Sequence, residues 1–354
     1  MTQNTHPTPS AATDIDPGKL GAFLSTQQDG DWRAPALERF VGGQSNPTYR
    51  LTAGAHDYVI RKKPGGVLLP SAHAIDREFR VMQALSGLGL PVPRPQLYVE
   101  DANVIGTPFY VMPFVKGRVF KDPALPGVSP DERAAIYGTM NDTLAALHNV
   151  EVDAAGLGNF GKAGDYYARQ IRRWTDQYRA VALEHSADME AVIEWLPAHL
   201  PAHEDRRLVH GDFRLENMIF HPTEPRLLAI LDWELSTLGD PLADLAYNMM
   251  AWYLPSRAFG GFTDRDMAAS GIPVESDYLA RYCRGTGREA LPGWPFYVAF
   301  SMFRLASILF GVLRRGLDGN ASSPDAVERG RLADVCAQAA CEAMRRYSIE
   351  EANA

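Results

Sequence analysis

Cysteine is scarce in this chain, and so are basic residues relative to acidic ones. The three cysteines, Cys283, Cys336 and Cys341, are too few for a disulfide framework and lack the spacing of a zinc site. They favour free thiols and a cytoplasmic location. The formal net charge is −8, so the basic footprint of a nucleic-acid-binding protein is missing, and we expect no nucleic-acid partner.

Long apolar runs are also rare. The first residues are polar and lack the hydrophobic core of a secretory signal. One stretch, 296–313, is apolar enough to raise the question of a membrane span, but Arg304 lies near its centre. Because a charge at the middle of a bilayer is costly, we expect a buried core helix with Arg304 paired or facing a cleft, and no membrane partner.

The chain has 354 residues, 46% of them hydrophobic, which predicts more than one compact unit. We expect a flexible tail at 1–17, a small strand-rich lobe at 18–115 and a large helical lobe at 116–354. In the small lobe, three antiparallel strands, a helix at 71–86 and two further strands at 95–100 and 107–113 are predicted. In the large lobe, helices are predicted at 130–149, 166–184, 188–199, 243–253, 296–315 and 324–347, with one strand pair near 218–220 and 227–231. The fold class is therefore α+β and bilobal, a form in which a nucleotide is commonly held between lobes.

The strongest motif is LVHGDFRLENMIF, followed by LLAILDWE. It contains Asp212, then Asn217 five residues later, then Asp232 after an apolar strand. Phosphoryl transfer needs a carboxylate that orients or deprotonates the attacking hydroxyl, and oxygen ligands for Mg²⁺. Asp212 suits the first role, and Asn217 and Asp232 suit the second.

This segment resembles the aminoglycoside-phosphotransferase-like kinases, which share the protein-kinase-like fold. The stretch from His210 to Tyr247 is similar to a subgroup whose kinase domains can be fused to acyl-CoA dehydrogenases. The resemblance implies that Asp212 is the catalytic base and that Asn217 and Asp232 are metal ligands. It also implies a structural role for His210.

The resemblance extends to residues around this motif. Asp244 is similar to the helix aspartate that holds the catalytic loop. Glu234 contacts metal or substrate, or only orients its loop; both alternatives stay open. Arg214 could stabilise charge on the transferring phosphoryl group, which we favour over a solvent-exposed arginine paired with Glu216. The chain has Asp232-Trp233-Glu234 where protein kinases have Asp-Phe-Gly, so a glycine-hinged movement of this loop is not expected.

The segment VGGQSNPTYRL resembles the loop that covers the phosphates. The glycines Gly42 and Gly43 would let the backbone approach the nucleotide, and Ser45 and Asn46 would donate hydrogen bonds to phosphate. A plain hairpin turn would look the same in sequence.

In kinase-like folds a cation on the third strand contacts the α- and β-phosphates and pairs with a helix glutamate. Strand alternation in HDYVIRKKP puts Arg61 in the inward position, with Lys62 on the opposite face. Lys63 returns to the side of Arg61 and is the second candidate, and a basic edge strand is the alternative. The predicted helix partner is Glu78.

The segment FYVMPFVKG resembles the strand that leads into the adenine-binding hinge. Backbone groups of Pro113, Phe114 and Val115 would line the adenine edge, and Met112 would lie at the back of the pocket. An ordinary core strand would have the same pattern.

These features predict an enzyme that phosphorylates a hydroxyl group of a small molecule with ATP and Mg²⁺. The subgroup resemblance implies a hydroxyacyl-CoA acceptor, for which Arg257, Arg281, Arg284, Arg304, Arg314 and Arg315 are candidate anion contacts. An aminoglycoside, a macrolide or an amino alcohol is the alternative acceptor, and a nucleotide-binding pseudokinase is the non-enzyme alternative. The oligomeric state and the choice between ATP and GTP stay open.

Overall fold

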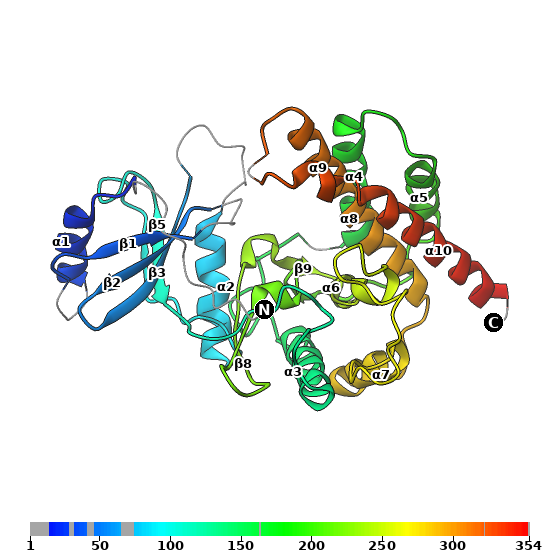
Figure 1. Cartoon of the computed structure of the whole chain (residues 1–354), viewed down its shortest axis with the longest axis horizontal. Helices are drawn as coiled ribbons and strands as arrows, with labels where there is room; N and C mark the ends of the chain where they lie inside the picture. The colour runs from blue at the N-terminus through cyan, green and yellow to red at the C-terminus, as the bar shows by residue number, and fades with distance from the viewer. Residues whose placement is uncertain are drawn as a thin grey trace. The chain divides into compact units, whose positions relative to one another are not determined.

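Five short antiparallel strands form a sheet with the order β1-β2-β3-β5-β4 (Figure 1). This computed structural model describes residues 14–27, 32–40, 46–64, 74–162, 164–321 and 323–352. The strands of the sheet are β1 (Ala36–Arg39), β2 (Thr48–Ala53), β3 (His56–Lys62), β4 (Leu97–Val99) and β5 (Phe109–Pro113). The predicted three-strand meander and the two following strands are thus confirmed.

Alternation of side chains gives the sheet its buried face. Along β2 the buried residues are Tyr49, Leu51 and Ala53, at every second position. A two-residue connection joins β2 to β3, because Ala53 pairs with His56, and Gly54 in this turn has a φ of 55°. Such tight hairpin turns need a left-handed backbone, which glycine adopts readily.

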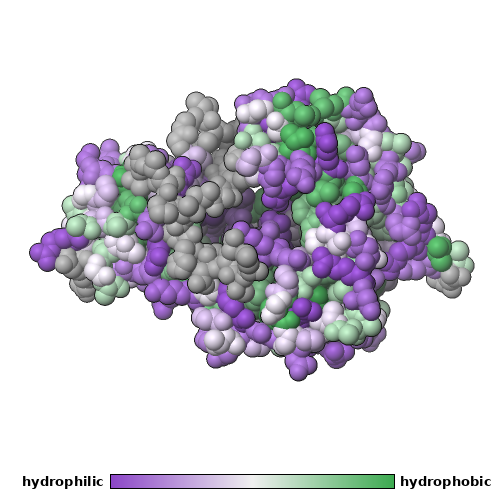
Figure 2. Space-filling view, viewed as in Figure 1, coloured by the Kyte–Doolittle hydropathy of each residue, from purple (hydrophilic) through white to green (hydrophobic). Residues whose placement is uncertain are grey.

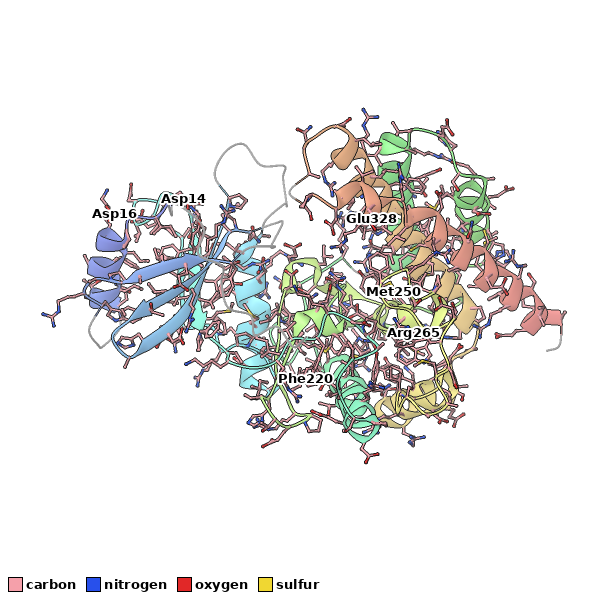
Figure 3. All side chains as sticks on the ribbon, in the orientation of Figure 1. Asp14, Asp16, Phe220, Met250, Arg265 and Glu328 are labelled. Atoms are coloured by element: carbon pink, nitrogen blue, oxygen red, sulfur yellow. The ribbon has the colours of Figure 1, made fainter. Side chains whose placement is uncertain are left out.

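Part of the predicted flexible tail at 1–17 packs against the sheet. The helix α1 (Pro17–Gln27) begins at the last residue of the predicted tail, and Ile15 before it is buried in the core under the sheet. Asp14, labelled in Figure 3, accepts hydrogen bonds from Tyr49 and Lys62 at 2.6 and 2.5 Å. The prediction failed here because these contacts to the sheet are non-local and leave no periodic pattern in the sequence.

The helix α2 (Ile75–Gly87) carries the residues predicted for the helix of the small lobe. A hairpin of β7 (Met218–Phe220) and β8 (Leu227–Ile230) belongs to the same compact unit, together with the chain up to Val119. Backbone hydrogen bonds between Arg118 and Phe220, both 2.8 Å, hold it there. We call this unit, the described residues of Thr2–Val119 and Asn217–Glu234, the strand unit. Its boundaries differ from the predicted lobe at 18–115, because a hairpin far along the chain joins it.

The remainder, Phe120–Glu216 and Leu235–Ala354, forms the helical unit. Its helices are α3 (Pro130–His148), α4 (Tyr166–Val181), α5 (Ala187–Ala198), α6 (Pro241–Asn248), α7 (Glu275–Thr286), α8 (Trp294–Leu317), α9 (Ala326–Gly330) and α10 (Ala333–Ala352). Short 3-10 turns are η1 (Leu215–Asn217) and η2 (Trp233–Leu235), each of which crosses a boundary between the units along the chain, and η3 (Met250–Tyr253) in the helical unit. One strand pair of the helical unit consists of β6 (Arg207–Val209) and β9 (Thr237–Gly239). The predicted α+β fold class is confirmed.

The helix α8 is the centre of the helical unit, since α4, α5, α6, α9 and α10 all pack on it. It is long and apolar enough to cross a membrane by length and composition alone, but 83% of its most apolar window is buried inside the molecule. This is the burial expected of a core helix, as predicted from Arg304.

Helix boundaries reflect local chemistry. The helix α6 starts after Asp240, whose side chain accepts the N–H of Leu242 at 2.9 Å, with Pro241 at the first helical position. The predicted single helix at 324–347 is wrong, because the chain forms α9 and α10 instead. Gly330 ends α9 where a side chain would clash with the backbone of Leu313 on α8. The helix α7 and the strands β6 and β9 were not predicted.

The surface of the helical unit is mostly hydrophilic on the face shown in Figure 2, where hydrophobic areas are small and separated. Exposed large hydrophobic side chains of this unit lie in different segments: Leu183, Leu200, Leu235, Val274, Leu317 and Ile349. Within the described part of the unit, these exposed side chains do not form one apolar helix face.

Candidate active site

In the strand unit, Arg61 on β3 is surrounded by three carboxylates. Its Nε lies 2.8 Å from Glu78 Oε2 on α2, and its Nη2 lies 2.9 Å from Asp232 Oδ1 and 3.4 Å from Glu234 Oε2. The predicted partner Glu78 is therefore present. Lys62 is directed to the opposite side, where its Nζ contacts Asp14, as strand alternation requires.

Glu78 is buried and receives more than one donor. The Asn46 amide donates to it at 2.7 Å, and the Tyr110 hydroxyl donates at 3.0 Å. Burial raises the pKa of Glu78 to about 7, although the adjacent Arg61 charge acts in the opposite direction. Asn46 was predicted to donate to a nucleotide phosphate, and the structure instead gives its amide to Glu78.

The two predicted metal ligands lie close together in the strand unit. The backbone N–H of Leu231 donates to the carbonyl of Asn217 at 2.8 Å, so Asn217 stands opposite the residue that precedes Asp232. Asp232 has a φ of 66°, a left-handed conformation that is rare for a residue with a Cβ and that gathers at functional sites.

This donor set fits Mg²⁺. A carboxylate and an amide side chain are oxygen ligands, and magnesium typically takes one or two protein carboxylates together with phosphate oxygens and water. Asp232 and Asn217 match that pattern. Glu234 also contacts Arg61, which supports the loop-orienting alternative for it without excluding a metal contact.

In the helical unit, Asp212 lies in a loop whose backbone is hydrogen-bonded by a buried side chain of α6. The buried carboxylate of Asp244 on α6 accepts the backbone N–H groups of His210 and Gly211, the latter at 2.7 Å. The predicted loop-holding role of Asp244 is thus seen in its contacts. His210 is fully buried, and its Nδ1 accepts the N–H of Asp212 at 3.1 Å, which agrees with a structural role.

Arg214 pairs with Glu216, as the alternative interpretation expected, and also with Asp212. Its Nε lies 3.1 Å from Asp212 Oδ1, and its Nη1 lies 2.9 Å from Glu216 Oε2. The side chain is 35% exposed, so it is neither buried nor a freely solvated surface residue.

Three further residues support this loop: Tyr247 and His148, which were not predicted, and Arg304, which was considered only as a core charge or an anion contact. Burial and the nearby charge of Asp212 raise the pKa of Tyr247, and Arg304 donates to the Gly211 carbonyl. His148 Nε2 lies 3.5 Å from Asp244 Oδ2, and its Nδ1 lies 2.7 Å from the hydroxyl of Tyr282. Tyr247 could have been found, because it follows Asp244 by three positions and so shares its helix face.

The predicted hinge is partly corrected. Phe114 was expected to offer backbone groups to adenine, but its N–H donates to the carbonyl of Asp57 at 3.0 Å. Its ring stacks on Phe40, and the Arg50 guanidinium lies 4.4 Å from its centroid. Met112 is buried on β5, Pro113 ends that strand, and Val115 follows, while Gly42, Gly43 and Ser45 lie outside the described residues.

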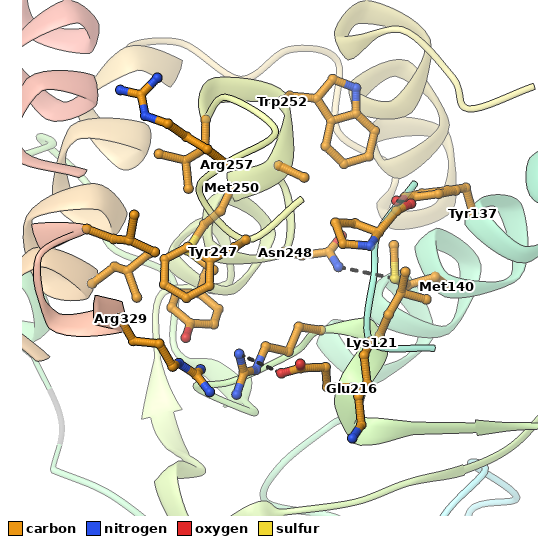
Figure 4. A pocket seen from close by; sticks show the side chains of 18 of the residues that line it. Lys121, Tyr137, Met140, Glu216, Tyr247, Asn248, Met250, Trp252, Arg257 and Arg329 are labelled. Carbon is orange, nitrogen blue, oxygen red and sulfur yellow. Dashed lines mark hydrogen bonds and ion pairs between the residues drawn. The ribbon is translucent and has the colours of Figure 1, made fainter. Parts of the chain in front are cut away.

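A cavity of about 440 Å³ opens beside the loop of Asp212 within the helical unit (Figure 4). Tyr247, Met250 and Trp252 contribute apolar wall, and Met250 and Glu328 come from segments far apart in sequence (Figure 3). The charged lining residues are Lys121, Arg214, Arg257 and Arg329, together with Glu216, Asp325 and Glu328. The lining thus contains four basic and three acidic side chains, and one basic residue, Arg214, is already paired with Glu216.

Of the six arginines considered for an anionic acceptor, Arg257 lines this cavity. Arg281 pairs with Asp142 and Arg314 with Asp318, both on the surface. Arg304 is buried under the Asp212 loop and does not line the cavity. Arg329 and Lys121 were not considered, because the sequence does not show which distant segments meet here.

The predicted site residues thus fall into two sets. Asp212 and Arg214 belong to the helical unit, and Arg61, Glu78, Asn217, Asp232 and Glu234 belong to the strand unit. The first set presents a carboxylate beside a cavity, and the second presents a buried cation beside oxygen ligands suited to magnesium.

Comparison with known proteins agrees with this chemistry. The sequence model of the phosphotransferase enzyme family, APH, matches residues 36–295. Mouse acyl-CoA dehydrogenase family member 10 is 49% identical over 323 residues, which cover 91% of this chain and 30% of the mouse protein. The chain spans less than half the length of the acyl-CoA dehydrogenase relatives that it matches.

Comparison with solved structures supports the same family and fold. The crystal structure of a candidate aminoglycoside phosphotransferase from Ralstonia eutropha JMP134 has a TM-score of 0.85 at 45% identity, covering 94% of this chain and 99% of that one. A ternary complex of a thermostable aminoglycoside phosphotransferase APH(4)-Ia mutant with AMP-PNP and hygromycin B has a TM-score of 0.55 at 17% identity. It covers 86% of this chain and 93% of that chain, and it shows a shared fold.

Proposed function

Because this chain belongs to the phosphotransferase enzyme family and is an enzyme that transfers phosphate to a hydroxyl group, we propose that it uses Mg·ATP to phosphorylate a hydroxyacyl-CoA. One observation carries the proposal: the Asp212 loop is fastened by buried contacts next to a cavity that has apolar walls and basic side chains. Each part of the reaction then has a residue in this chain that suits it.

The strand unit supplies the nucleotide contacts in this proposal. Arg61 contacts the phosphates, and Glu78 holds Arg61 in place. Asn217 and Asp232 would hold Mg²⁺, which when bound neutralises charge on the phosphates. The choice of ATP is supported by the AMP-PNP complex of a protein with the same fold.

The helical unit supplies the acceptor side. Asp212 accepts the proton of the acceptor hydroxyl, whose oxygen forms a bond to the γ-phosphorus while the bond from that phosphorus to the leaving oxygen of ADP breaks. Arg214, beside Asp212, is placed to stabilise negative charge on the transferring group.

Two observations favour a hydroxyacyl-CoA over an aminoglycoside. An aminoglycoside is a polycation and would favour an acidic site, whereas the cavity has no excess of acidic residues. Arg257 and Arg329 could meet a phosphorylated carrier, and Tyr247, Met250 and Trp252 could meet an acyl chain. Relatives named acyl-CoA dehydrogenase family members also agree with an acyl-CoA context.

The test is transfer of label from [γ-³²P]ATP to a panel of acceptors. The panel contains hydroxyacyl-CoAs of several chain lengths, aminoglycosides, macrolides and amino alcohols, with Asp212→Asn as the inactive control. Label on a hydroxyacyl-CoA that disappears in Asp212→Asn would support the proposal. Label on an antibiotic would keep the reaction and overturn the acceptor, and transfer that survives in Asp212→Asn would overturn the role of Asp212.

A further inference from the structure

Arg304 is a charged side chain on an otherwise apolar helix, and the reaction proposed above gives it no role. It is only 6% exposed, and among the residues that the structure describes it makes no ion pair with a carboxylate. Burying an unpaired guanidinium is costly, so a fold that keeps one needs other contacts that compensate for the cost.

Two of its three contacts, to Gly211 and Tyr247, lead to the loop of the proposed base, and the third is to Trp174 on α4. The Nη2 of Arg304 donates to the carbonyl oxygen of Gly211. Its guanidinium carbon lies 4.9 Å from the centroid of the Tyr247 ring and 5.6 Å from that of Trp174, within the range of cation–π attraction.

The Gly211 carbonyl belongs to the peptide group whose N–H is that of Asp212. That N–H donates to His210 Nδ1 at 3.1 Å, so the peptide is held at its oxygen by Arg304 and at its nitrogen by His210. The N–H of Gly211 itself is taken by Asp244. Gly211 has a φ of 84°, and a side chain there would clash with the backbone of Leu235.

Arg304 is also linked to the Asp212 carboxylate through Tyr247. Burial and the charge of Asp212 raise the pKa of the Tyr247 hydroxyl, so this hydroxyl lies near the Asp212 carboxylate, and the Tyr247 ring centroid lies 4.9 Å from the Arg304 guanidinium carbon. Tyr247 also lines the cavity beside this loop, with its hydroxyl shown in Figure 4. One buried cation therefore contacts both the peptide that precedes Asp212 and the tyrosine near its carboxylate.

We propose that Arg304 is a positioning residue for phosphoryl transfer, because it fixes the Gly211–Asp212 peptide plane and the Tyr247 ring and so aims the Asp212 carboxylate at the acceptor hydroxyl. The inference rests on the proposed function. It predicts an effect on turnover rather than on substrate binding, because Arg304 does not line the cavity.

The variants Arg304→Met, Arg304→Lys and Tyr247→Phe test this, and Arg314→Met is the matched control. Arg314 is on the same helix but on the surface, paired with Asp318. We expect Arg304→Met to lower kcat about 10- to 100-fold, since misplacement of a reacting group by about 1 Å costs on that order. KM for ATP should change less than about threefold, Arg304→Lys should regain part of the loss by donating to Gly211, and Arg314→Met should stay near wild type.

A second readout does not depend on activity. Hydrogen exchange measured by mass spectrometry should show that Arg304→Met speeds exchange in the peptide spanning Gly211 and Asp212 by at least about fivefold, with Arg314→Met unchanged. If Arg304→Met does not fold, Arg304→Lys and Tyr247→Phe carry the same comparison. Wild-type exchange and wild-type kcat in a folded Arg304→Met would overturn the inference. Absence of Asp212-dependent transfer in wild type would overturn the proposed function instead, and the exchange readout would still decide whether Arg304 holds the loop.

Discussion

The carboxylate of Asp244 accepts the backbone N–H of Gly211 at 2.7 Å, in a region from which water is excluded. The same carboxylate accepts the N–H of His210, so two backbone donors depend on one side chain. A buried donor left without an acceptor lowers the free energy of unfolding by about 1–3 kcal/mol. The segment that carries the proposed catalytic base is therefore tied to the stability of the helical unit.

Removal of the Asp244 side chain should destabilise the protein. We expect Asp244→Ala to lower the free energy of unfolding by about 2–5 kcal/mol, because both backbone donors lose their acceptor. The matched control is Asp142→Ala, which breaks an exposed pair with Arg281 and should cost less than about 1 kcal/mol. Urea unfolding followed by circular dichroism measures both, and equal losses in the two variants would contradict the assignment.

The same carboxylate predicts a pH dependence. Burial opposes the ionised form of Asp244, but hydrogen bonding and charge from His148 and contacts from His210 hold the pKa of that carboxyl below its ordinary value of 3.8. The Asp244 carboxyl therefore binds a proton more readily in the unfolded state than in the folded state. Its contribution to stability is complete well above pH 3.8 and is lost as the pH falls toward the lower pKa of the folded state.

The comparison with Asp244→Asn isolates this contribution, since the other carboxylates are common to both proteins. The gap in unfolding free energy between wild type and Asp244→Asn should stay constant from pH 7 to about pH 4.5 and should narrow below about pH 4. Urea titrations at a series of pH values give the gap. A gap that closes between pH 7 and pH 5 would mean that Asp244 is not held in its ionised form.

Local rules in the sequence account for part of this site. Alternation along β3 separates Arg61 from Lys62, and helical periodicity places Glu78 on the inner face of α2; both positions agree with the structure.

Non-local contacts account for what was missed. The bond from Arg304 to Gly211 joins residues 93 positions apart, and no periodicity encodes such a partner. The strands β6 and β9 have three residues each and exist because they pair with one another, so their local pattern is too short to detect. The same reason explains why the packing of Asp14 against β3 was mistaken for a flexible tail.

The two candidate phosphate contacts, Arg61 on β3 and Lys63 directly after it, can be separated by substitution. We expect Arg61→Gln to raise KM for ATP about 10- to 100-fold, because Arg61 is fixed by Glu78 in the strand unit. Lys63→Gln, two positions further along the chain and just past the end of β3, should change KM for ATP less than about threefold. Initial rates over a range of Mg·ATP concentrations give both values, and a larger effect in Lys63→Gln would transfer the role to that residue.

The role of Glu234 can be decided in the same assay by varying Mg²⁺. Asp232→Ala should raise the Mg²⁺ concentration needed for half-maximal rate by about tenfold or more, because it removes a proposed metal ligand. If Glu234 only orients the loop through Arg61, Glu234→Gln should leave that concentration within about threefold of wild type. A Mg²⁺ requirement that is unchanged in Asp232→Ala would remove Asp232 from the metal site.

The basic lining of the cavity predicts how an acyl-CoA would be held. Arg257 and Arg329 line the cavity, and among the described residues neither makes an ion pair with a carboxylate, although the charge of Arg329 contributes to lowering the pKa of Asp325. We expect Arg257→Ala and Arg329→Ala each to raise KM for a hydroxyacyl-CoA about 5- to 50-fold, since a charge-assisted hydrogen bond contributes about 1–2 kcal/mol. KM for ATP should not change, because the proposed nucleotide contacts lie in the other unit. Arg281→Ala, which removes a surface arginine paired with Asp142, is the matched control and should leave both constants near wild type. The salt dependence provides a second check. KM for the acyl-CoA should rise with ionic strength in wild type, and it should rise less steeply in the double variant that combines Arg257→Ala and Arg329→Ala. The reason is that salt can screen only those ionic contacts that are present. A KM for acyl-CoA that is unchanged in the double variant would place the carrier outside this cavity.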